Sequence, residues 1–196
     1  MYNALYNILM PLVKCFYKVF FFAKSYGKEN VPKETSVIIC GNHSSNHDGV
    51  ILAGFIPRKM NFIAKKELFK FKLVAKILYG LGARPVDRSK NDISVVRAAL
   101  SILKENGGLL IFPEGTRNLP DINDTKDGAV SIALKTKTPL IPVKIVGKFR
   151  LFSGIRVIFG KEYDLTPYYD KKLSQEEIHA ITLDLMKTIY EMEEVK

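Results

Sequence analysis

The chain has 196 residues, which is enough for one domain with a sizeable hydrophobic core. Hydrophobic residues make up 47% of it and aromatic residues 11%, which excludes an intrinsically disordered chain. The formal net charge of +10 predicts an anionic partner, such as nucleic acid, phospholipid headgroups, or an acidic substrate or carrier. Cys15 and Cys40 lie in apolar runs, so we expect two buried thiols in a reducing compartment and no disulfide framework.

Residues 1–24 are dominated by apolar and aromatic side chains. At helical spacing their few polar side chains fall on one narrow stripe, which consists of Asn3, Asn7, Lys14 and Lys18. We expect a helix, kinked or split at Pro11, that lies in a membrane interface while its lysines reach the headgroups. The two lysines argue against a transmembrane span. A signal peptide is not expected either, because the segment has no basic n-region and no small-residue cleavage site. A terminal helix packed on the core is the alternative interpretation.

Strands and helices alternate after a turn-rich connector at residues 26–32. We expect strands at 37–40, 61–64, 109–112, 139–146 and 157–159, and helices at 50–55, 68–81, 92–106 and 174–192. Ser174 and Glu177 form a capping-box pattern at the start of the last helix. The alternation predicts an α/β fold with a largely parallel mixed sheet flanked by helices. We therefore divide the chain into an N-terminal amphipathic membrane-interface segment, 1–26, and one α/β domain, 27–196.

Five lysines between residues 65 and 76 alternate with Phe69 and Phe71: Lys65, Lys66, Lys70, Lys72 and Lys76. One interpretation is a solvated helix face. The other is a basic surface that faces an anionic membrane together with the N-terminal segment.

The first candidate site follows the apolar run at 37–40, where His43 is expected in a loop at the end of a buried strand. Asp48 lies five residues later, where its carboxylate can cap the next helix and still reach the imidazole. A histidine oriented by a carboxylate is the minimal equipment of a general base. The alternative is a polar turn residue followed by an ordinary helix cap.

A second loop follows the predicted strand at 109–112 and contains Glu114, Gly115, Thr116 and Arg117. Glycine permits close approach of the backbone to a ligand, and an arginine offers a planar fork for phosphate or carboxylate. Arg88 comes from a third segment, the extended run at 82–88. A base beside a phosphate clamp is suited to deprotonating a hydroxyl on a phosphorylated substrate.

Other chemistries lack their usual motifs in this sequence. It contains neither G-x-S-x-G nor a Walker A loop, so a covalent serine mechanism and nucleotide hydrolysis are not expected. We do not expect Ser44 or Ser45, which neighbour His43, to act as nucleophiles. His179 has no acidic or nucleophilic partner in the sequence, so we expect it to be structural or on the surface.

Several of these motifs together resemble the glycerolipid acyltransferase family. The run from Asn42 to Asp48 (N-H-x-x-x-x-D) resembles the first motif of that family, 82–88 the second, and 112–117 (F-P-E-G-T-R) the third. Residues 126–128 and 140–143 resemble the later lysine-glycine element and the fourth motif. The order and intervals agree from about residue 27 to residue 160, and the small size resembles the 1-acylglycerol-3-phosphate acyltransferase branch.

The resemblance implies direct transfer of a fatty acyl group from acyl-CoA or acyl carrier protein to the free hydroxyl of lysophosphatidic acid, giving phosphatidic acid. His43 would be the general base and Asp48 would orient it. The glycerol phosphate would be held by Arg88, Glu114, Gly115, Thr116 and Arg117. The resemblance implies no cofactor and no metal, an anionic membrane surface as a further partner, and a peripheral or monotopic location on the cytoplasmic face.

His47 departs from the family pattern, in which an aromatic or aliphatic residue is common. We expect His47, Asn42 and Lys126 to support or line the site, and two histidines without a third ligand predict no zinc site. One alternative function is an acyltransferase with another acceptor: glycerol 3-phosphate, another lysophospholipid or an amino-acid lipid. The other is a non-catalytic basic protein that binds membrane or nucleic acid, although arginine tracts and RNA-binding signatures are absent, so no nucleic-acid partner is expected.

Overall fold

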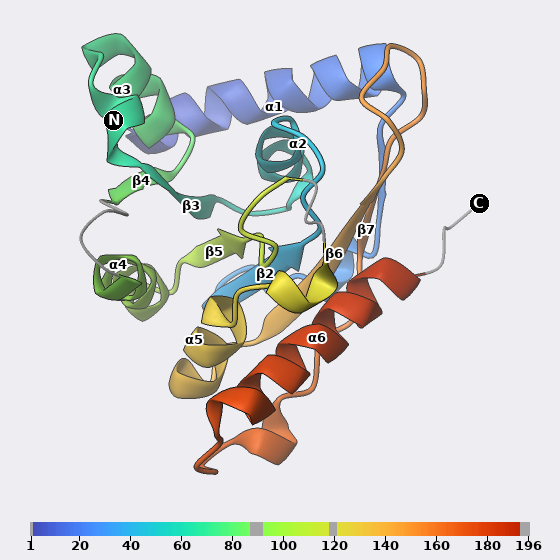
Figure 1. Ribbon diagram of the computed structural model, residues 1–196. Helices are drawn as coiled ribbons and strands as arrows, with labels where there is room; N and C mark the ends of the chain where they lie inside the picture. Colours follow the sequence, from blue (N-terminus) through green and yellow to red (C-terminus); the bar gives the residue numbers. More distant parts are fainter. Residues whose placement is uncertain (1, 87–91, 118–120, 193–196) are drawn as a thin grey trace.

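The computed structural model describes residues 2–86, 92–117 and 121–192 (Figure 1). These residues form a seven-stranded sheet in the order β1-β7-β6-β2-β5-β3-β4. The strands are β1 (Lys24–Tyr26), β2 (Val37–Gly41), β3 (Met60–Lys65), β4 (Ala83–Val86), β5 (Gly108–Ile111), β6 (Leu140–Val146) and β7 (Arg156–Phe159). Neighbouring strands are parallel except β6 and β7, which are antiparallel. The predicted α/β fold with a largely parallel mixed sheet is confirmed.

Helices cover both faces of the sheet (Figure 1). On one side lie α1 (Tyr2–Phe21) and α2 (Asp48–Phe55), and on the other lie α4 (Asp92–Lys104), α5 (Gly128–Thr136) and α6 (Gln175–Glu191). Helix α3 (Lys72–Gly80) stands at the sheet edge beside β4 and contacts α1. Short 3-10 turns are η1 (Lys28–Asn30), η2 (Lys66–Phe69), η3 (Ile122–Asp124) and η4 (Thr166–Tyr168).

Strand β2 lies in the middle of this sandwich, and all five of its residues are buried. Because successive side chains point to opposite faces, Val37 and Ile39 pack with α1 and α2, whereas Ile38 and Cys40 pack with α4, α5 and α6. Cys40 is buried as predicted, and this burial raises the pKa of its thiol. A strand fixed on both faces gives the loop at its carboxyl end a rigid base.

Helix α1 has features of both interpretations of the N-terminal segment, the helix with an exposed apolar face and the helix packed on the core. It is one continuous helix that contains Pro11, so of the two predicted forms, kinked or split, the split is wrong and the kink stays a prediction. One face is buried against the domain, and the other exposes large apolar side chains to solvent. Cys15 lies on the exposed side, which corrects the expectation that both thiols are buried. The sheet begins inside the segment 1–26, because Lys24–Tyr26 pairs with β7.

Three further elements differ from the prediction. The helix expected at 68–81 is divided into η2 and α3, and its apolar residues are largely exposed because α3 lies beyond the edge strand: Leu73, Val74 and Ile77. Strand β1 and helix α5 were not predicted. The predicted capping box at Ser174 and Glu177 is confirmed at the start of α6.

Candidate active site

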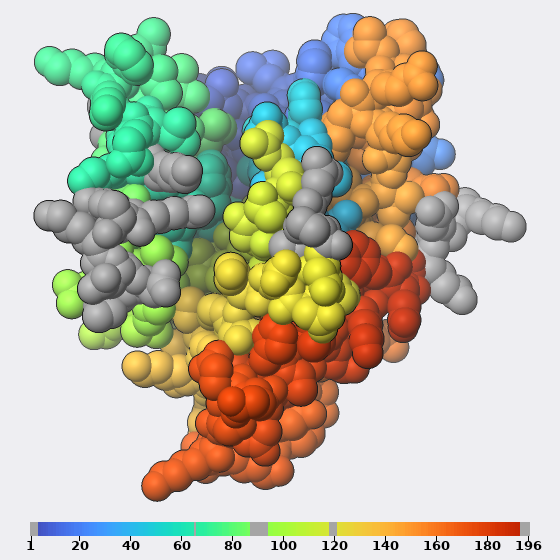
Figure 2. Space-filling view, viewed as in Figure 1, coloured from blue at the N-terminus to red at the C-terminus, as the bar shows by residue number. Residues whose placement is uncertain are grey.

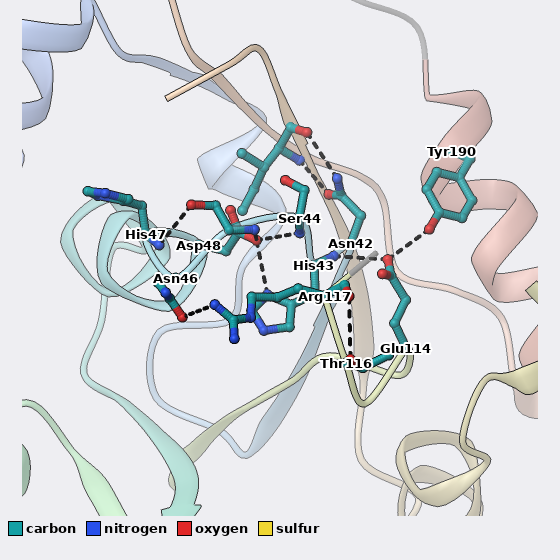
Figure 3. Close-up of polar contacts among 12 residues, drawn as sticks. Asn42, His43, Ser44, Asn46, His47, Asp48, Glu114, Thr116, Arg117 and Tyr190 are labelled. Carbon is teal, nitrogen blue, oxygen red and sulfur yellow. Dashed lines mark hydrogen bonds and ion pairs between the residues drawn. The ribbon is translucent and has the colours of Figure 1, made fainter. Parts of the chain in front are cut away.

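Two loops meet at the carboxyl ends of neighbouring parallel strands. The register of β2 and β5 pairs Cys40 with Ile111, so residues 42–47 and 112–117 leave the sheet side by side. Figure 3 shows the polar side chains of both loops converging. Asn42 ties the first loop to β6, since its amide donates to Ile145 O and accepts from Ile145 N. The two candidate loops therefore lie next to each other at this edge of the sheet.

Asp48 is the buried centre of the first loop. Its Oδ2 accepts hydrogen bonds from Ser44 N and Ser45 N, both at 2.7 Å, and lies 3.0 Å from His43 Nδ1. As the first residue of α2 it also lies at the positive end of that helix. The carboxylate therefore accepts hydrogen bonds from the backbone of the preceding loop, and it does not cap α2 as expected.

This geometry selects one tautomer of His43. A carboxylate can only accept, so the imidazole proton lies on Nδ1 and the Nε2 atom is left as the acceptor. The ring is stacked on Phe112, with centroids 4.3 Å apart and planes at 17°. The His43 side chain remains 21% exposed. It is held on one side and reachable on the other, as a general base must be.

Glu114 fixes the backbone of His43 from the second loop. Its Oε1 accepts from His43 N at 2.9 Å and from the Tyr190 hydroxyl at 2.7 Å (Figure 3). Burial and the Glu114 carboxylate raise the pKa of Tyr190, so its hydroxyl keeps the proton that it donates. Glu114 is itself buried. The geometry thus gives Glu114 a positioning role, and contact with a substrate phosphate stays a prediction.

Three of the predicted clamp residues, Gly115, Thr116 and Arg117, lie at the exposed end of the second loop. Arg117 Nη1 donates to Asn46 Oδ1 at 2.5 Å, which directs the guanidinium towards the first loop. Gly115 has φ +67, a conformation that favours glycine, and Thr116 is exposed. Lys126 N donates to Pro113 O, and its side chain is exposed. Arg88 lies outside the described residues.

His47 belongs to a different cluster from His43. Its Nδ1 is 2.7 Å from the hydroxyl of Tyr17 on α1, and its ring stacks on Phe149 at 4.9 Å. Burial and the charge of Asp48 raise the pKa of Tyr17 to about 12, so Tyr17 is the donor at neutral pH. The imidazole of His47 is directed away from His43 in Figure 3. It joins α1 to the start of α2, beside the His43–Asp48 pair.

Sequence reasoning missed several contributors to this region. Tyr190, Tyr17 and Asn46 each bond a predicted site residue, and Phe112 supports the His43 ring. Only Asn46 and Phe112 lie within the recognised motifs. His179, expected to be structural or on the surface, bonds Asp127 at 2.9 Å and joins α6 to the start of α5. Within the described ranges, no three His, Cys, Asp or Glu side chains are grouped to hold a metal ion.

Comparison with known proteins identifies a family that this chain matches. The acyltransferase family model matches residues 23–146. The chain is 34% identical over 176 residues to the 1-acyl-sn-glycerol-3-phosphate acyltransferase of Bacillus subtilis, covering 87% of each protein. It is 30% identical over 167 residues to the Streptococcus pneumoniae protein of the same name, covering 81% of this chain and 61% of that protein.

A solved structure shows the same fold. The crystal structure of the 1-acyl-sn-glycerophosphate (LPA) acyltransferase PlsC from Thermotoga maritima matches 97% of this chain and 98% of its own, with a TM-score of 0.64 and 24% identity. The family match spans β1 to β6 and includes both loops of the site. The chain belongs to the acyltransferase family.

Proposed function

We propose that this enzyme transfers a fatty acyl group from an acyl thioester to the free hydroxyl of 1-acyl-sn-glycerol 3-phosphate, giving phosphatidic acid for phospholipid synthesis. The observation that carries the proposal is the His43–Asp48 pair, beside the exposed guanidinium of Arg117. The names of two similar proteins, those of Bacillus subtilis and Streptococcus pneumoniae, support the acceptor. The donor is acyl-CoA or acyl carrier protein, and both are anionic, as the net charge of +10 favours.

In the proposed reaction the acceptor oxygen attacks the thioester carbonyl carbon while its proton passes to His43 Nε2. The tetrahedral intermediate then expels the thiolate, which takes the proton from the imidazolium and leaves as free thiol. Asp48 stabilises the imidazolium through the 3.0 Å contact to Nδ1. General-base catalysis of this kind contributes roughly 10²–10⁴ in rate, and holding two substrates together contributes much of the rest.

Arg117 and Arg88 are proposed to hold the acceptor phosphate, with Gly115 and Thr116 beside it. The support for Arg117 is its position: it extends from the second loop across to Asn46 on the first, close to the base. Glu114 is proposed to fix the backbone of His43 instead of the phosphate, because its Oε1 already accepts hydrogen bonds from His43 N and the Tyr190 hydroxyl. Ser45 is already engaged, since its Oγ accepts from His47 N, which favours direct transfer over a seryl intermediate.

The enzyme is proposed to work on the cytoplasmic face of a membrane, where the acceptor is concentrated. Residues Ala4–Phe21 have a mean hydropathy of 1.3, and only 22% of this window is buried. The exposed apolar side chains of α1 lie opposite the face that packs on the domain: Ile8, Leu12, Phe16, Val19 and Phe20. A helix held by the domain along one face is suited to lying in the interface plane. Leu73 and Ile77 extend the apolar surface over α3, beside exposed lysines.

The test is a panel of acceptors assayed with acyl-CoA and with acyl carrier protein, with products identified by mass. Lysophosphatidic acid should give phosphatidic acid with a kcat/KM at least 10-fold above glycerol 3-phosphate or lysophosphatidylglycerol. A preference for either of these would assign another acceptor. Salt-sensitive DNA binding with no thioester turnover would instead favour the non-catalytic alternative.

A further inference from the structure

The loop between β6 and β7 is larger than its connection requires. The two strands are antiparallel neighbours, which a turn of two to five residues can join, yet the connection runs over residues 147–155. At its tip, Leu151 is 61% and Phe152 58% exposed. Phe152 has φ +61, an unfavourable backbone conformation for a bulky residue. An enlarged loop that presents two apolar side chains to solvent needs a functional explanation.

This loop is fixed to the end of α1 and continues its exposed apolar face. Phe152 N donates to Phe20 O at 2.7 Å, and Ile155 N donates to Phe21 O at 3.1 Å. The exposed rings of Phe152 and Phe22 are in contact, with centroids 5.3 Å apart. Figure 1 shows the loop standing beside the C-terminal end of α1. A membrane that met the exposed face of α1 would therefore also meet the loop.

The charges around the apolar tip favour an anionic ligand. Lys148 and Arg150 are exposed, and the sequence contains no Asp or Glu from residue 128 to residue 161. The cavity beside the tip is lined by Lys148, Arg150, Leu151 and Ser153 and has a volume of about 360 Å³. It is open to solvent, and two of its four lining side chains are cations. Cations around a cavity with an apolar tip beside it match the headgroup and acyl chain of an anionic phospholipid.

The loop also lies on the opposite side of the active site from α3. In Figure 2 the η2–α3 region and the loop project on either side of a hollow, and the two active-site loops lie between them. Phe149, at the base of the loop, stacks on His47 next to Asp48. Contact of both projections with one surface would turn the hollow towards the bilayer that holds the acceptor.

We propose that residues 147–154 form a second membrane-binding element, in which Leu151 and Phe152 enter the edge of the hydrocarbon while Lys148 and Arg150 bind an anionic phospholipid headgroup. The inference extends the membrane location proposed above to a separate part of the chain. It does not depend on which acceptor the enzyme uses, because its tests are read from vesicles without turnover.

The absence of tryptophan from the chain allows a direct probe. We expect the emission of Phe152→Trp to shift to the blue with vesicles of phosphatidylglycerol and phosphatidylcholine, and to be quenched by brominated acyl chains. Phosphatidylcholine alone should give a much smaller response. Tyr168→Trp is the matched control and should not respond, because Tyr168 packs on the other face of the sheet with the core residues of α6. Emission of Phe152→Trp that stays unshifted and unquenched while the protein floats with anionic vesicles would overturn the proposal.

Charge and apolar contact are tested separately by vesicle flotation. Lys148→Gln/Arg150→Gln should weaken binding to anionic vesicles about 25-fold at low salt, from roughly 5-fold for each cation near the surface. Leu151→Ser/Phe152→Ser should weaken it at high salt as well. The matched control Lys171→Gln/Lys172→Gln removes two exposed cations from the segment before α6 and should bind like the parent. Equal binding by the loop variants and the control would contradict the proposal. It would also be contradicted if the loop variants bound vesicles normally and lost turnover only with acyl carrier protein as the donor.

Discussion

Replacement of Asp48 by asparagine isolates the effect of its negative charge. Three donors converge on one carboxylate oxygen, so the asparagine must present its own oxygen to Ser44 N, Ser45 N and His43 Nδ1. The tautomer of His43 is therefore preserved and only the charge is lost. The new NH₂ group takes the place of Oδ1, which is buried and has no hydrogen-bond partner among the described residues. This should cost about 1–3 kcal/mol of stability while leaving the protein folded.

The size of the kinetic effect follows from the contact with the imidazolium. Two unit charges 3.0 Å apart attract by roughly 5 kcal/mol at an effective dielectric constant of about 20. Solvent reduces this value, because the His43 side chain is 21% exposed. The lower limit is the excess of a charged over a neutral hydrogen bond, about 1–2 kcal/mol. We expect kcat to fall by about 10- to 10³-fold.

Steady-state kinetics with a thiol-release assay measures this effect, and circular dichroism checks the fold. The KM for lysophosphatidic acid should change little, because Asp48 is buried and does not face the acceptor. Asp170→Asn, which removes a carboxylate from an exposed pair with Lys137, is the control and should leave kcat unchanged. His43→Ala/Asp48→Asn should be no slower than His43→Ala. A folded Asp48→Asn enzyme within 3-fold of the parent kcat would refute the catalytic role of the pair.

Three further outcomes follow. Tyr190→Phe removes one of two donors to Glu114 and should lower kcat about 5-fold, with both KM values unchanged in steady-state kinetics. Arg117→Ala should raise the KM of the acceptor about 10-fold or more and leave the KM of the donor unchanged. An effect on the donor KM alone would show that the arginine binds the phosphates of the thioester donor. The free energy of unfolding, measured by urea titration, should fall from about pH 10 to about pH 12. Unfolded tyrosine ionises near 10.0 and folded Tyr17 near 12, so the folded chain binds more protons in this window, and Tyr17→Phe should flatten the decline.

The exposed and buried faces of α1 also decide how the membrane proposal can be tested. Tyr6, Met10, Tyr17 and Phe21 are buried in the domain, so deletion of the helix would damage the core and the contact to His47. Leu12→Ser/Phe16→Ser alters only the exposed face and should reduce flotation with anionic vesicles while the melting temperature stays near that of the parent. Unchanged flotation would assign membrane binding to another surface.

The strands that carry the site could be predicted because their signals are local. β2 and β5 are short apolar runs that end in turn residues, and the motifs follow directly. Parallel pairing then brings the loops together without further information. The capping box of α6 is equally local, since Ser174 and Glu177 lie within one turn.

The missed features depend on packing between distant segments. The hydrogen bond from Tyr190 joins residues 76 positions apart, and that from Tyr17 joins residues 30 apart. β1 has three residues, Lys24–Tyr26, whose strand state depends on pairing with β7. α5 begins at Gly128 with no side-chain cap, so its start has no local signal. The exposure of Cys15 was predicted wrongly because α1 is apolar nearly all round, and contacts with distant elements such as α2 and α3 decide which face is buried.

The most direct test of the central claim is release of free thiol from acyl-CoA and from acyl carrier protein, with and without lysophosphatidic acid, by the parent enzyme and by His43→Ala. Direct transfer with His43 as the base predicts release that matches phosphatidic acid formed, no burst without acceptor, and a rate at least about 10²-fold lower for folded His43→Ala. A burst of thiol without acceptor, or equal rates for the parent and His43→Ala, would contradict the account.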